Sequence, residues 1–307
     1  MLKNSLYYAK ILLFGEYGII EDSMGLSIPF GSYKGALTFE EQNDLSNSSL
    51  KAFCQFLVNH PAHNFDTYLH LDLFEDDIQR GLSFKSSIPQ GFGVGSSGAL
   101  VAAIYDRYKK DIPDASSPTK EKLVNLKNLL GKMESHFHGK SSGLDPLICY
   151  FNLPVLQKSK TEMDMVGLPD TPKENKGAIF LLDSGKPGET QPMIHIFMQK
   201  MKEEGFRKML KTQFKKYNDA CIQALLNGNK TPLFYNIKKL SSLLLAHFKP
   251  MIPAHLHKIW KKGIETEKYF LKLCGSGGGG FVLGFTTDYE ATKVELKDFK
   301  LEMVSSL

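Results

Sequence analysis

The chain has 307 residues, of which 42% are hydrophobic and 23% charged, and its formal net charge is +5. This composition is typical of a folded globular protein, excludes a disordered or fibrous one, and provides enough chain for two domains. No apolar run reaches the length of a membrane span, and Lys10 and Glu16 interrupt the apolar N-terminal stretch, so we expect a cytoplasmic protein without a signal peptide. The four cysteines are far apart and include no Cys-x-x-Cys pair, which argues against a disulfide framework or a zinc site.

The first half of the chain predicts short strands followed by helices. Residues 5–20 (SLYYAKILLFGEYGII) predict a buried strand, a turn at Gly15 and a second short strand. Turn-forming residues fill 81–90, and a glycine-rich loop follows Pro89. The remaining expected elements are two strands, around 34–39 and 67–73, and two helices, over 96–110 and 119–137.

The second half predicts helices between strands, after a polar, lysine-rich stretch at 158–176 that we take as the domain boundary. The expected elements are a strand at 177–183, two or three helices over 193–247, a helix near 252–268, strands at 269–274 and 281–285, and a final helix and strand. The overall pattern is α+β, with an N-terminal domain at residues 1–175 and a C-terminal domain at residues 176–307.

The most informative stretch is PQGFGVGSS, residues 89–97. Its glycines at alternate positions, Gly91, Gly93 and Gly95, allow the backbone to curl and approach a ligand closely. The loop leads into a helix, whose free amides and dipole favour a phosphate, and Ser96 and Ser97 add hydroxyls for phosphate or Mg²⁺. Neither a Walker loop nor a dinucleotide fingerprint has this spacing. A flexible turn capped by serine is the alternative.

Two acids follow in ESHFHGKSSGLD, residues 134–145. Glu134 closes a predicted helix and Asp145 lies beyond a turn, so one could bind a hard cation while the other faces a substrate hydroxyl. The alternative is that both are surface acids, the commonest position for such residues. His136 and His138 are two residues apart, point in different directions on a helix, and are interpreted as packing residues.

Two further features need an explanation. Lys10 lies in an otherwise apolar strand, which indicates either a carboxylate partner or an edge strand that directs the lysine to solvent. Residues 272–285 (KLCGSGGGGFVLGF) place glycines between two apolar strands, which indicates either backbone lining a site or a plain glycine-rich hairpin.

Together these stretches resemble the GHMP kinases, the family of galactokinase, homoserine kinase, mevalonate kinase and phosphomevalonate kinase. The three motifs of the family are matched in order by KILLFGEYGII, PQGFGVGSSGA and KLCGSGGGGF. Within the family, HGKSSGLD with Glu134 upstream is similar to the stretch of mevalonate kinases that carries the catalytic aspartate. The resemblance implies the two-domain α+β GHMP kinase fold, with an N-terminal domain like ribosomal S5 domain 2 and a ferredoxin-like C-terminal domain.

The resemblance also implies an ATP- and Mg²⁺-dependent phosphotransferase acting on the hydroxyl of a small molecule, most similar to mevalonate kinase in isoprenoid precursor synthesis. Asp145 would accept the proton of the attacking hydroxyl, and Lys10 would pair with Asp145 and stabilise developing charge. The other implied roles are ATP phosphate binding by Gly91, Gly93, Gly95, Ser96 and Ser97, Mg²⁺ binding by Glu134 and Ser97 (with Ser96 as the neighbouring alternative), and substrate contacts from Glu16, Tyr17, Gly275 and Gly277.

The sequence departs from the family pattern at several places. Tyr17 stands where mevalonate kinases generally have histidine, and Gly98 replaces the usual alanine after the two serines. The pair 140–141 (Lys-Ser) replaces a residue-proline pair, and Pro146 directly follows Asp145. Residues 23–30 (SMGLSIPF) also match poorly the loop that follows the first motif in the family. The first and last of these departures lie near the substrate side, so they bear on the substrate more than on the kinase chemistry.

Three alternatives stay open. The chain could be another GHMP kinase, for phosphomevalonate, homoserine or a sugar, or a non-catalytic ligand-sensing protein of the same fold. Nucleic-acid binding is suggested by the basic stretch 199–216, but its interspersed Glu203 and Glu204 favour a solvated helix face. We therefore expect a small-molecule partner and neither nucleic acid nor membrane, and the sequence leaves open whether the protein is a homodimer.

Overall fold

The computed structural model describes residues 5–39, 44–110, 120–159, 161–169 and 175–307. The chain forms two compact units. Unit 1 consists of residues 1–10, 29–89 and 95–153, and unit 2 of residues 11–28, 90–94 and 154–307. Thr119, the expected first residue of a helix, lies outside the described residues.

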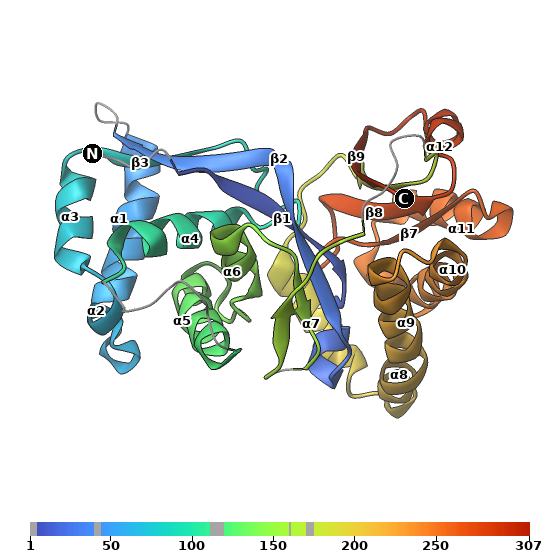
Figure 1. Ribbon diagram of the computed structural model, residues 1–307, viewed down its shortest axis with the longest axis horizontal. Helices are drawn as coiled ribbons and strands as arrows, with labels where there is room; N and C mark the ends of the chain where they lie inside the picture. Colours follow the sequence, from blue (N-terminus) through green and yellow to red (C-terminus); the bar gives the residue numbers. More distant parts are fainter. Residues whose placement is uncertain (1–4, 40–43, 111–119, 160, 170–174) are drawn as a thin grey trace. The chain divides into compact units, whose positions relative to one another are not determined.

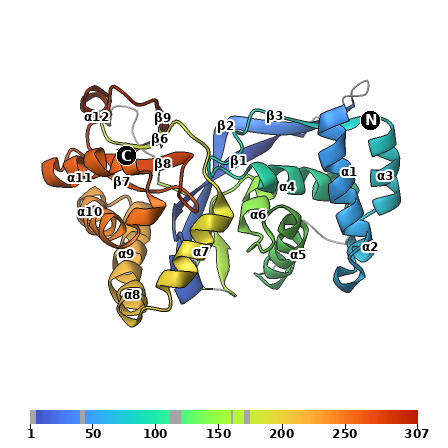
Figure 2. The same ribbon diagram turned by 180° about the vertical axis from the view of Figure 1, so that it is seen from behind.

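Unit 1 contains the first residues of β1 (Tyr7–Phe14), a pair of strands and a group of helices. The C-terminal half of β2 (Gly25–Phe39) pairs antiparallel with β3 (Leu82–Ser86), in a register that runs from Gly35 opposite Ser86 to Phe39 opposite Leu82. Figures 1 and 2 show the helices of this unit gathered on one side of these strands. They are α1 (Asp44–Val58), α2 (Phe65–Tyr68), α3 (Leu71–Gln79), α4 (Ser96–Tyr108), α5 (Lys120–His138) and α6 (Leu144–Phe151).

Helix α4 lies at the centre of unit 1, packed against α5 and α6. Its small residues Ala99, Ala102 and Ala103 are fully buried, so neighbouring backbones can approach the helix closely. Close approach matters most at α6, because Asp145 lies in its first turn.

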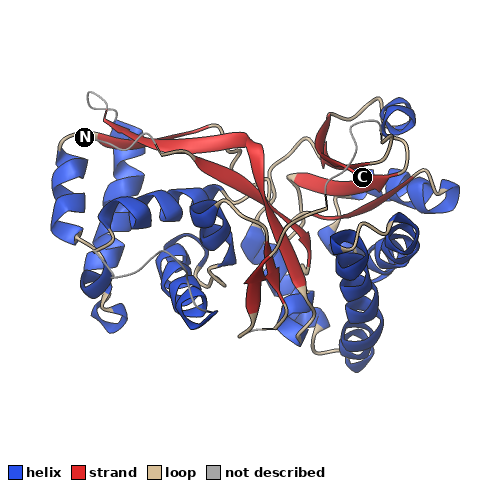
Figure 3. Ribbon diagram, in the orientation of Figure 1, coloured by secondary structure: helices blue, strands red, loops and turns tan. Residues whose placement is uncertain are grey.

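Unit 2 contains an antiparallel sheet with the strand order β7-β8-β6-β9. Every residue of β7 (Tyr269–Leu273) and β8 (Phe281–Thr286) is buried, as expected of strands covered on both faces. Strand β6 (Ala178–Asp183) lies between β8 and β9 (Leu301–Ser306), and β7 and β9 are the edge strands of this sheet. Figure 3 distinguishes this sheet from its helices, which are α7 (Thr190–Lys200), α8 (Glu204–Met209), the π-helical turn η3 (Leu210–Phe214), α9 (Lys215–Leu226), α10 (Lys230–His247), α11 (His257–Thr266) and α12 (Tyr289–Glu295).

Unit 2 also includes the first residues of β2, residues 25–28, of which 25–27 pair with β4 (Val155–Gln157), and β4 in turn pairs with β5 (Met163–Met165). Strand β1 (Tyr7–Phe14) is next to β2 in the order β1-β2-β4-β5. Both β1 and β2 contribute residues to the two units, so the units divide the chain differently from a single boundary at residues 175 and 176.

The α+β class and most predicted elements are confirmed, and two predicted strands are wrong. Residues 17–20 form a tight turn and the first part of a 3₁₀ helix, η1 (Gly18–Glu21), instead of a second strand. Residues 67–73 belong to α2 and the start of α3, because Phe74 and Ile78, four residues apart on α3, bury one helical face. Strand β3 lies where only turns were expected. Among the described residues, no helix has the length and apolarity to cross a membrane.

Candidate active site

The second motif ends at the beginning of α4 in unit 1. Gly95 precedes the helix with φ of +80°, a backbone conformation that favours glycine, and its carbonyl accepts the amide of Ala99. A Cβ at Gly95 would lie 2.8 Å from Cγ of Lys10, so the lysine side chain packs directly on the loop. Because the first four amides of a helix have no partner within it, this end of α4 is suited to an anion such as phosphate.

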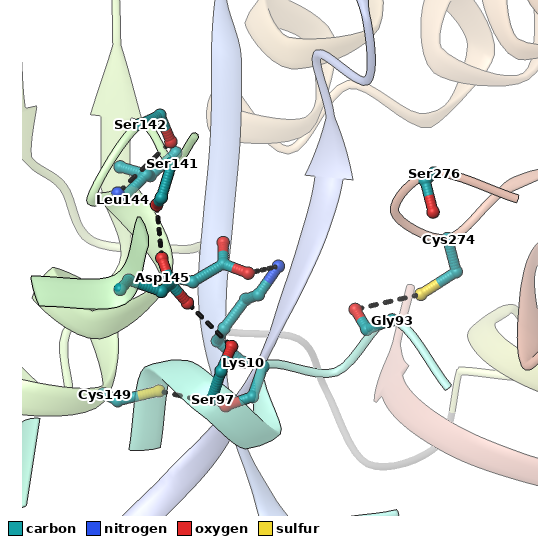
Figure 4. A network of polar contacts seen from close by, with 12 residues as sticks. Lys10, Gly93, Ser97, Ser141, Ser142, Leu144, Asp145, Cys149, Cys274 and Ser276 are labelled. Carbon is teal, nitrogen blue, oxygen red and sulfur yellow. Dashed lines mark hydrogen bonds and ion pairs between the residues drawn. The ribbon is translucent and has the colours of Figure 1, made fainter. Parts of the chain in front are cut away.

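Lys10 and Asp145 form an ion pair in unit 1, with 2.8 Å between Nζ and Oδ2. The lysine side chain is 4% exposed and the aspartate 34%, so the carboxylate remains reachable while its partner is held in place. Figure 4 shows the two side chains pointing towards each other near the start of α4. The partner that the apolar surroundings of Lys10 required is therefore this carboxylate.

Gly98 explains how Asp145 comes so close to α4. A Cβ at this position would lie 2.9 Å from the carbonyl carbon of Asp145 and 3.0 Å from the nitrogen of Pro146. Both atoms belong to the backbone and cannot rotate away. The replacement of alanine by Gly98 is therefore matched to the path of the chain through Asp145 and Pro146.

Three polar side chains of unit 1 contact the carboxylate of Glu134, two of them directly and the third through Ser97. The Ser97 hydroxyl donates to Glu134 Oε1 at 2.8 Å, and the Ser141 hydroxyl donates to Oε2. His138 Nε2 lies 3.0 Å from Ser97 Oγ. While the Ser97 hydroxyl donates to Glu134, its oxygen can accept from His138 in the imidazole tautomer that carries its proton on Nε2.

The carboxyl group of Glu134 is 3% exposed and has an unusual proton affinity. Burial, followed by the negative charge of Asp145, raises the pKa of Glu134 to about 7. Hydrogen bonds from Ser141 and Ser97, and the charge of Lys10, act in the opposite direction. A carboxylate that is costly to ionise in isolation is stabilised when a cation binds beside it.

The donor set around Ser97 and Glu134 fits a magnesium ion. Mg²⁺ takes oxygen ligands and is usually held by one or two carboxylates together with substrate phosphates, and Ser97 and Glu134 supply a hydroxyl and a carboxylate at the helix end. In the part of the chain that the structure describes, no group of three or more His, Cys, Asp or Glu residues could hold a metal by itself. Phosphate oxygens and water would complete the coordination.

In unit 2, the first half of the second motif lies against the third motif. The amide of Phe281 donates to the carbonyl of Phe92 at 3.3 Å, and the amide of Gly188 donates to Gly91 at 2.7 Å. Figure 4 shows the Cys274 thiol directed at the carbonyl of Gly93. The predicted nucleotide-loop residues Gly91 and Gly93 are thus backed by the glycine run of the third motif.

The predicted substrate-side residues Glu16 and Tyr17 also have partners in unit 2. Glu16 forms a buried ion pair with Lys272, and the Tyr17 hydroxyl donates to the backbone carbonyl of Ser276 at 2.7 Å. Gly275 and Gly277 flank this carbonyl, so all four predicted residues lie in one neighbourhood of unit 2.

Sequence reasoning missed three polar residues of these networks. His138 was interpreted as a packing residue, Ser141 appeared only as a departure from the family pattern, and no partner was suggested for Lys272. A signal existed for Lys272, because a lysine in an apolar strand needs a carboxylate, the argument used for Lys10. Nothing local marks Ser141, whose role depends on how the turn after α5 folds back on Glu134.

The comparisons with known proteins agree with this geometry. Residues 62–152 match the family described as GHMP kinases N terminal domain. Among curated proteins, none matches the sequence.

Among solved structures, the mevalonate kinase of L. major in complex with R-mevalonate is 16% identical, with a TM-score of 0.63 over 100% of this chain and 97% of that one. The phosphomevalonate kinase of Streptococcus pneumoniae in complex with phosphomevalonate and AMPPNP is 14% identical, with a TM-score of 0.65 over 98% and 100%. The galactokinase of Lactococcus lactis complexed with galactose is 11% identical, with a TM-score of 0.63 over 98% and 92%.

Residues 62–152 thus match the N-terminal domain of the GHMP kinases, and the chain has the same two-domain α+β fold as the similar structures along its whole length. The resemblance drawn from the three sequence motifs is confirmed, and mevalonate kinases are among the similar structures.

Proposed function

We propose that the protein is a Mg²⁺·ATP-dependent kinase that phosphorylates the hydroxyl of a small molecule, and that this molecule is mevalonate, in isoprenoid precursor synthesis. The observation that carries this proposal is the pairing of Lys10 with Asp145 beside the Ser97–Glu134 pair at the start of α4. One pair supplies a carboxylate for a hydroxyl proton, and the other supplies oxygen ligands at a phosphate-binding helix end.

Asp145 accepts the proton of the acceptor hydroxyl in this proposal. The acceptor oxygen forms a bond to the γ-phosphorus of ATP, the bond from that phosphorus to the bridging β–γ oxygen breaks, and ADP leaves with the bridging electrons. In a loose transition state the proton moves late, and Asp145 then mainly orients the hydroxyl. Lys10 fixes the Asp145 carboxylate and lies close enough to the helix end to stabilise charge on the transferred group.

The ATP phosphates would be bound by the loop at Gly91, Gly93 and Gly95 and by the first amides of α4, with Ser96 beside them. Ser97 and Glu134 would hold Mg²⁺, which when bound neutralises phosphate charge. His138 and Ser141 act on these ligands indirectly, because His138 is hydrogen-bonded to Ser97 and Ser141 donates to Glu134. They keep the hydroxyl and the carboxylate in fixed orientations before the nucleotide arrives.

The choice of mevalonate is supported by the similarity of residues 138–145, with Glu134 upstream, to the mevalonate kinase pattern. Glu16, Tyr17, Gly275 and Gly277 are the substrate-side residues of this proposal. Phosphomevalonate kinase is the second candidate, because a structure of that enzyme with phosphomevalonate reaches a TM-score of 0.65.

The proposal is tested by ADP release from Mg²⁺·ATP with mevalonate, phosphomevalonate, homoserine or galactose as acceptor. The variant Asp145→Asn should lose activity by about a hundredfold or more, as expected when a positioned proton acceptor is removed, and should still bind ATP. Asp106→Asn is the matched control, because Asp106 forms a lysine–aspartate pair with Lys109 at 2.7 Å in the same unit and has no place in the proposed site.

Turnover of mevalonate alone, lost in Asp145→Asn and kept in Asp106→Asn, would support both the reaction and the role of Asp145. Turnover of another acceptor would retain the kinase and replace the substrate. ATP binding without turnover of any of the four would favour a ligand-sensing protein, and near-normal turnover by Asp145→Asn would overturn the catalytic assignment.

A further inference from the structure

The first motif contains a strained turn that its catalytic assignment does not explain. Tyr17 has φ of 59° and ψ of −32°, and the amide of Gly18 donates to the carbonyl of Glu16 at 2.6 Å. A bond between residues i and i+2 around a central residue with positive φ is a γ-turn of the rare, strained kind. An aromatic residue with positive φ is unusual, and such a conformation persists only where its surroundings hold it.

The side chains of two turn residues are tied to the third motif within unit 2. The Glu16 carboxylate is paired with the ammonium of Lys272, which is 1% exposed, donates also to the carbonyl of Leu273, and lies over the ring of Phe14 at 5.6 Å. The Tyr17 hydroxyl donates to Ser276 O at 2.7 Å. Lys272 and Ser276 stand at the two ends of the segment that leads from β7 into the glycine run.

The ring of Tyr17 is held as firmly as its hydroxyl. It stacks on Phe197 with 4.5 Å between the ring centroids and an interplanar angle of 26°, and Phe248 lies 6.0 Å away. Burial, with a smaller effect of the Glu16 charge, raises the pKa of Tyr17 above its ordinary value, so the hydroxyl remains a donor at any working pH. The Tyr17 ring is therefore held in place, and its hydroxyl donates to the backbone carbonyl of Ser276.

The glycine loop itself needs such support. Its amides at Gly278 and Gly280 donate to Met251 and Lys186, at 2.7 and 2.6 Å. Glycine runs have high conformational freedom in the absence of constraints, and a loop that closes near a ligand must be ordered before binding to avoid the entropic cost at that step.

We propose that Tyr17 is a positioning residue that, together with the Glu16–Lys272 pair, fixes the Gly275–Gly280 loop in its binding conformation without itself touching the acceptor. This inference rests on the proposed function in assigning the loop to the acceptor side. The strain of the γ-turn is offset by the hydroxyl bond to Ser276 and by the stack on Phe197.

The test compares Tyr17→Phe with Tyr269→Phe. The first change removes the hydroxyl and keeps the ring stack, so the fold should survive. Tyr269→Phe is a matched control, because its hydroxyl also donates to a backbone carbonyl of unit 2, Ile259 O at 2.8 Å, and lies outside the motifs. Both are studied by hydrogen exchange of peptides covering 275–280 and by steady-state kinetics with the acceptor that the wild-type protein uses.

Loss of one neutral hydrogen bond should accelerate amide exchange in 275–280 by about three- to tenfold in Tyr17→Phe and leave it unchanged in Tyr269→Phe. KM for the acceptor should rise by a similar factor, while kcat changes less than about twofold. Exchange is measured without any acceptor, so it decides the positioning role even if the wild-type protein turns over none of the acceptors tested.

Unchanged exchange in Tyr17→Phe would overturn the proposal whatever the kinetics. A fall in kcat with unchanged exchange would instead indicate that the hydroxyl contacts the reacting groups. Equal effects of the two variants would reduce Tyr17 to a general contribution to stability, which also contradicts the inference. Failure of the proposed function is distinct from all of these, because it appears as absent turnover in the wild-type protein.

Discussion

Glu134 should make the metal-free protein less stable as the pH rises, and Glu134→Gln should remove this effect. The carboxyl group is buried, and its pKa is raised from an ordinary 4.5 to about 7 in the folded protein. Between these two values the folded state holds a proton that the unfolded state has lost, so the free energy of unfolding falls with increasing pH. At about 1.4 kcal/mol for each pH unit, the rise to about 7 corresponds to about 3 kcal/mol.

Glutamine has the size of the protonated acid and cannot ionise. Wild type and Glu134→Gln should therefore have similar stability near pH 4.5, and the variant should become more stable by about 3 kcal/mol above pH 7. Urea unfolding without divalent cations, followed by far-ultraviolet circular dichroism, measures this difference. Glu134 lies in unit 1, whereas Trp260 is buried in unit 2, so the fluorescence of Trp260 reports the unfolding of unit 2 separately.

Glu295 provides a control of opposite sign. Lys262 and Lys268 lower its pKa to about 2, so its stabilising contribution is present above an ordinary pKa of 4.5 and is lost only as the pH falls towards 2. Glu295→Gln should therefore not gain stability as the pH rises. A difference between wild type and Glu134→Gln that is constant from pH 5 to 8, or that reverses sign, would refute the account of Glu134 as an electrostatic cost that a cation relieves.

Two further predictions concern a buried ion pair and a close backbone contact. Lys272→Met should destabilise the protein by about 3–5 kcal/mol, because it leaves the Glu16 carboxylate buried without its cation. Combining Lys272→Met with Glu16→Gln should recover most of this stability in urea unfolding, and additive losses in the double variant would contradict the pairing. Gly98→Ala should cost about 1–3 kcal/mol despite the higher helix propensity of alanine, and should lower kcat by displacing Asp145; a more stable variant with normal kcat would show that the backbone at Asp145 gives way.

The sequence predicted much of the fold because its strongest patterns are local. The helix after the second motif was expected at residues 96–110 and runs from Ser96 to Tyr108. The strand at 67–73 was wrong because TYLHLDL alternates like a strand, whereas burial of Phe74 and Ile78 further along selects a helix. Strand β3 was missed because its five residues acquire a partner only from β2, which is remote in sequence.

The sequence predicted a contact of the candidate site where one buried charge requires a partner of opposite charge. A lysine in an apolar strand required a carboxylate, and Asp145 is that carboxylate. Serines have no such requirement, since their hydroxyls are satisfied by water or backbone in most settings. The Ser141 contact with Glu134 and the Tyr17 contact with Ser276 depend on loop paths, which no local pattern determines.

Three departures from the family pattern have local physical partners in this chain. Gly98 makes room for the backbone of Asp145 and Pro146, Ser141 supplies a hydroxyl to the carboxylate of Glu134, and Tyr17 supplies one to the carbonyl of Ser276. The first two lie within the proposed phosphate and metal apparatus of unit 1, where they adjust the supports of Asp145 and Glu134. Only Tyr17 lies on the proposed acceptor side, and its hydroxyl is committed to the backbone. Substrate preference in this chain is therefore best sought in the conformation that Tyr17 imposes on the glycine loop.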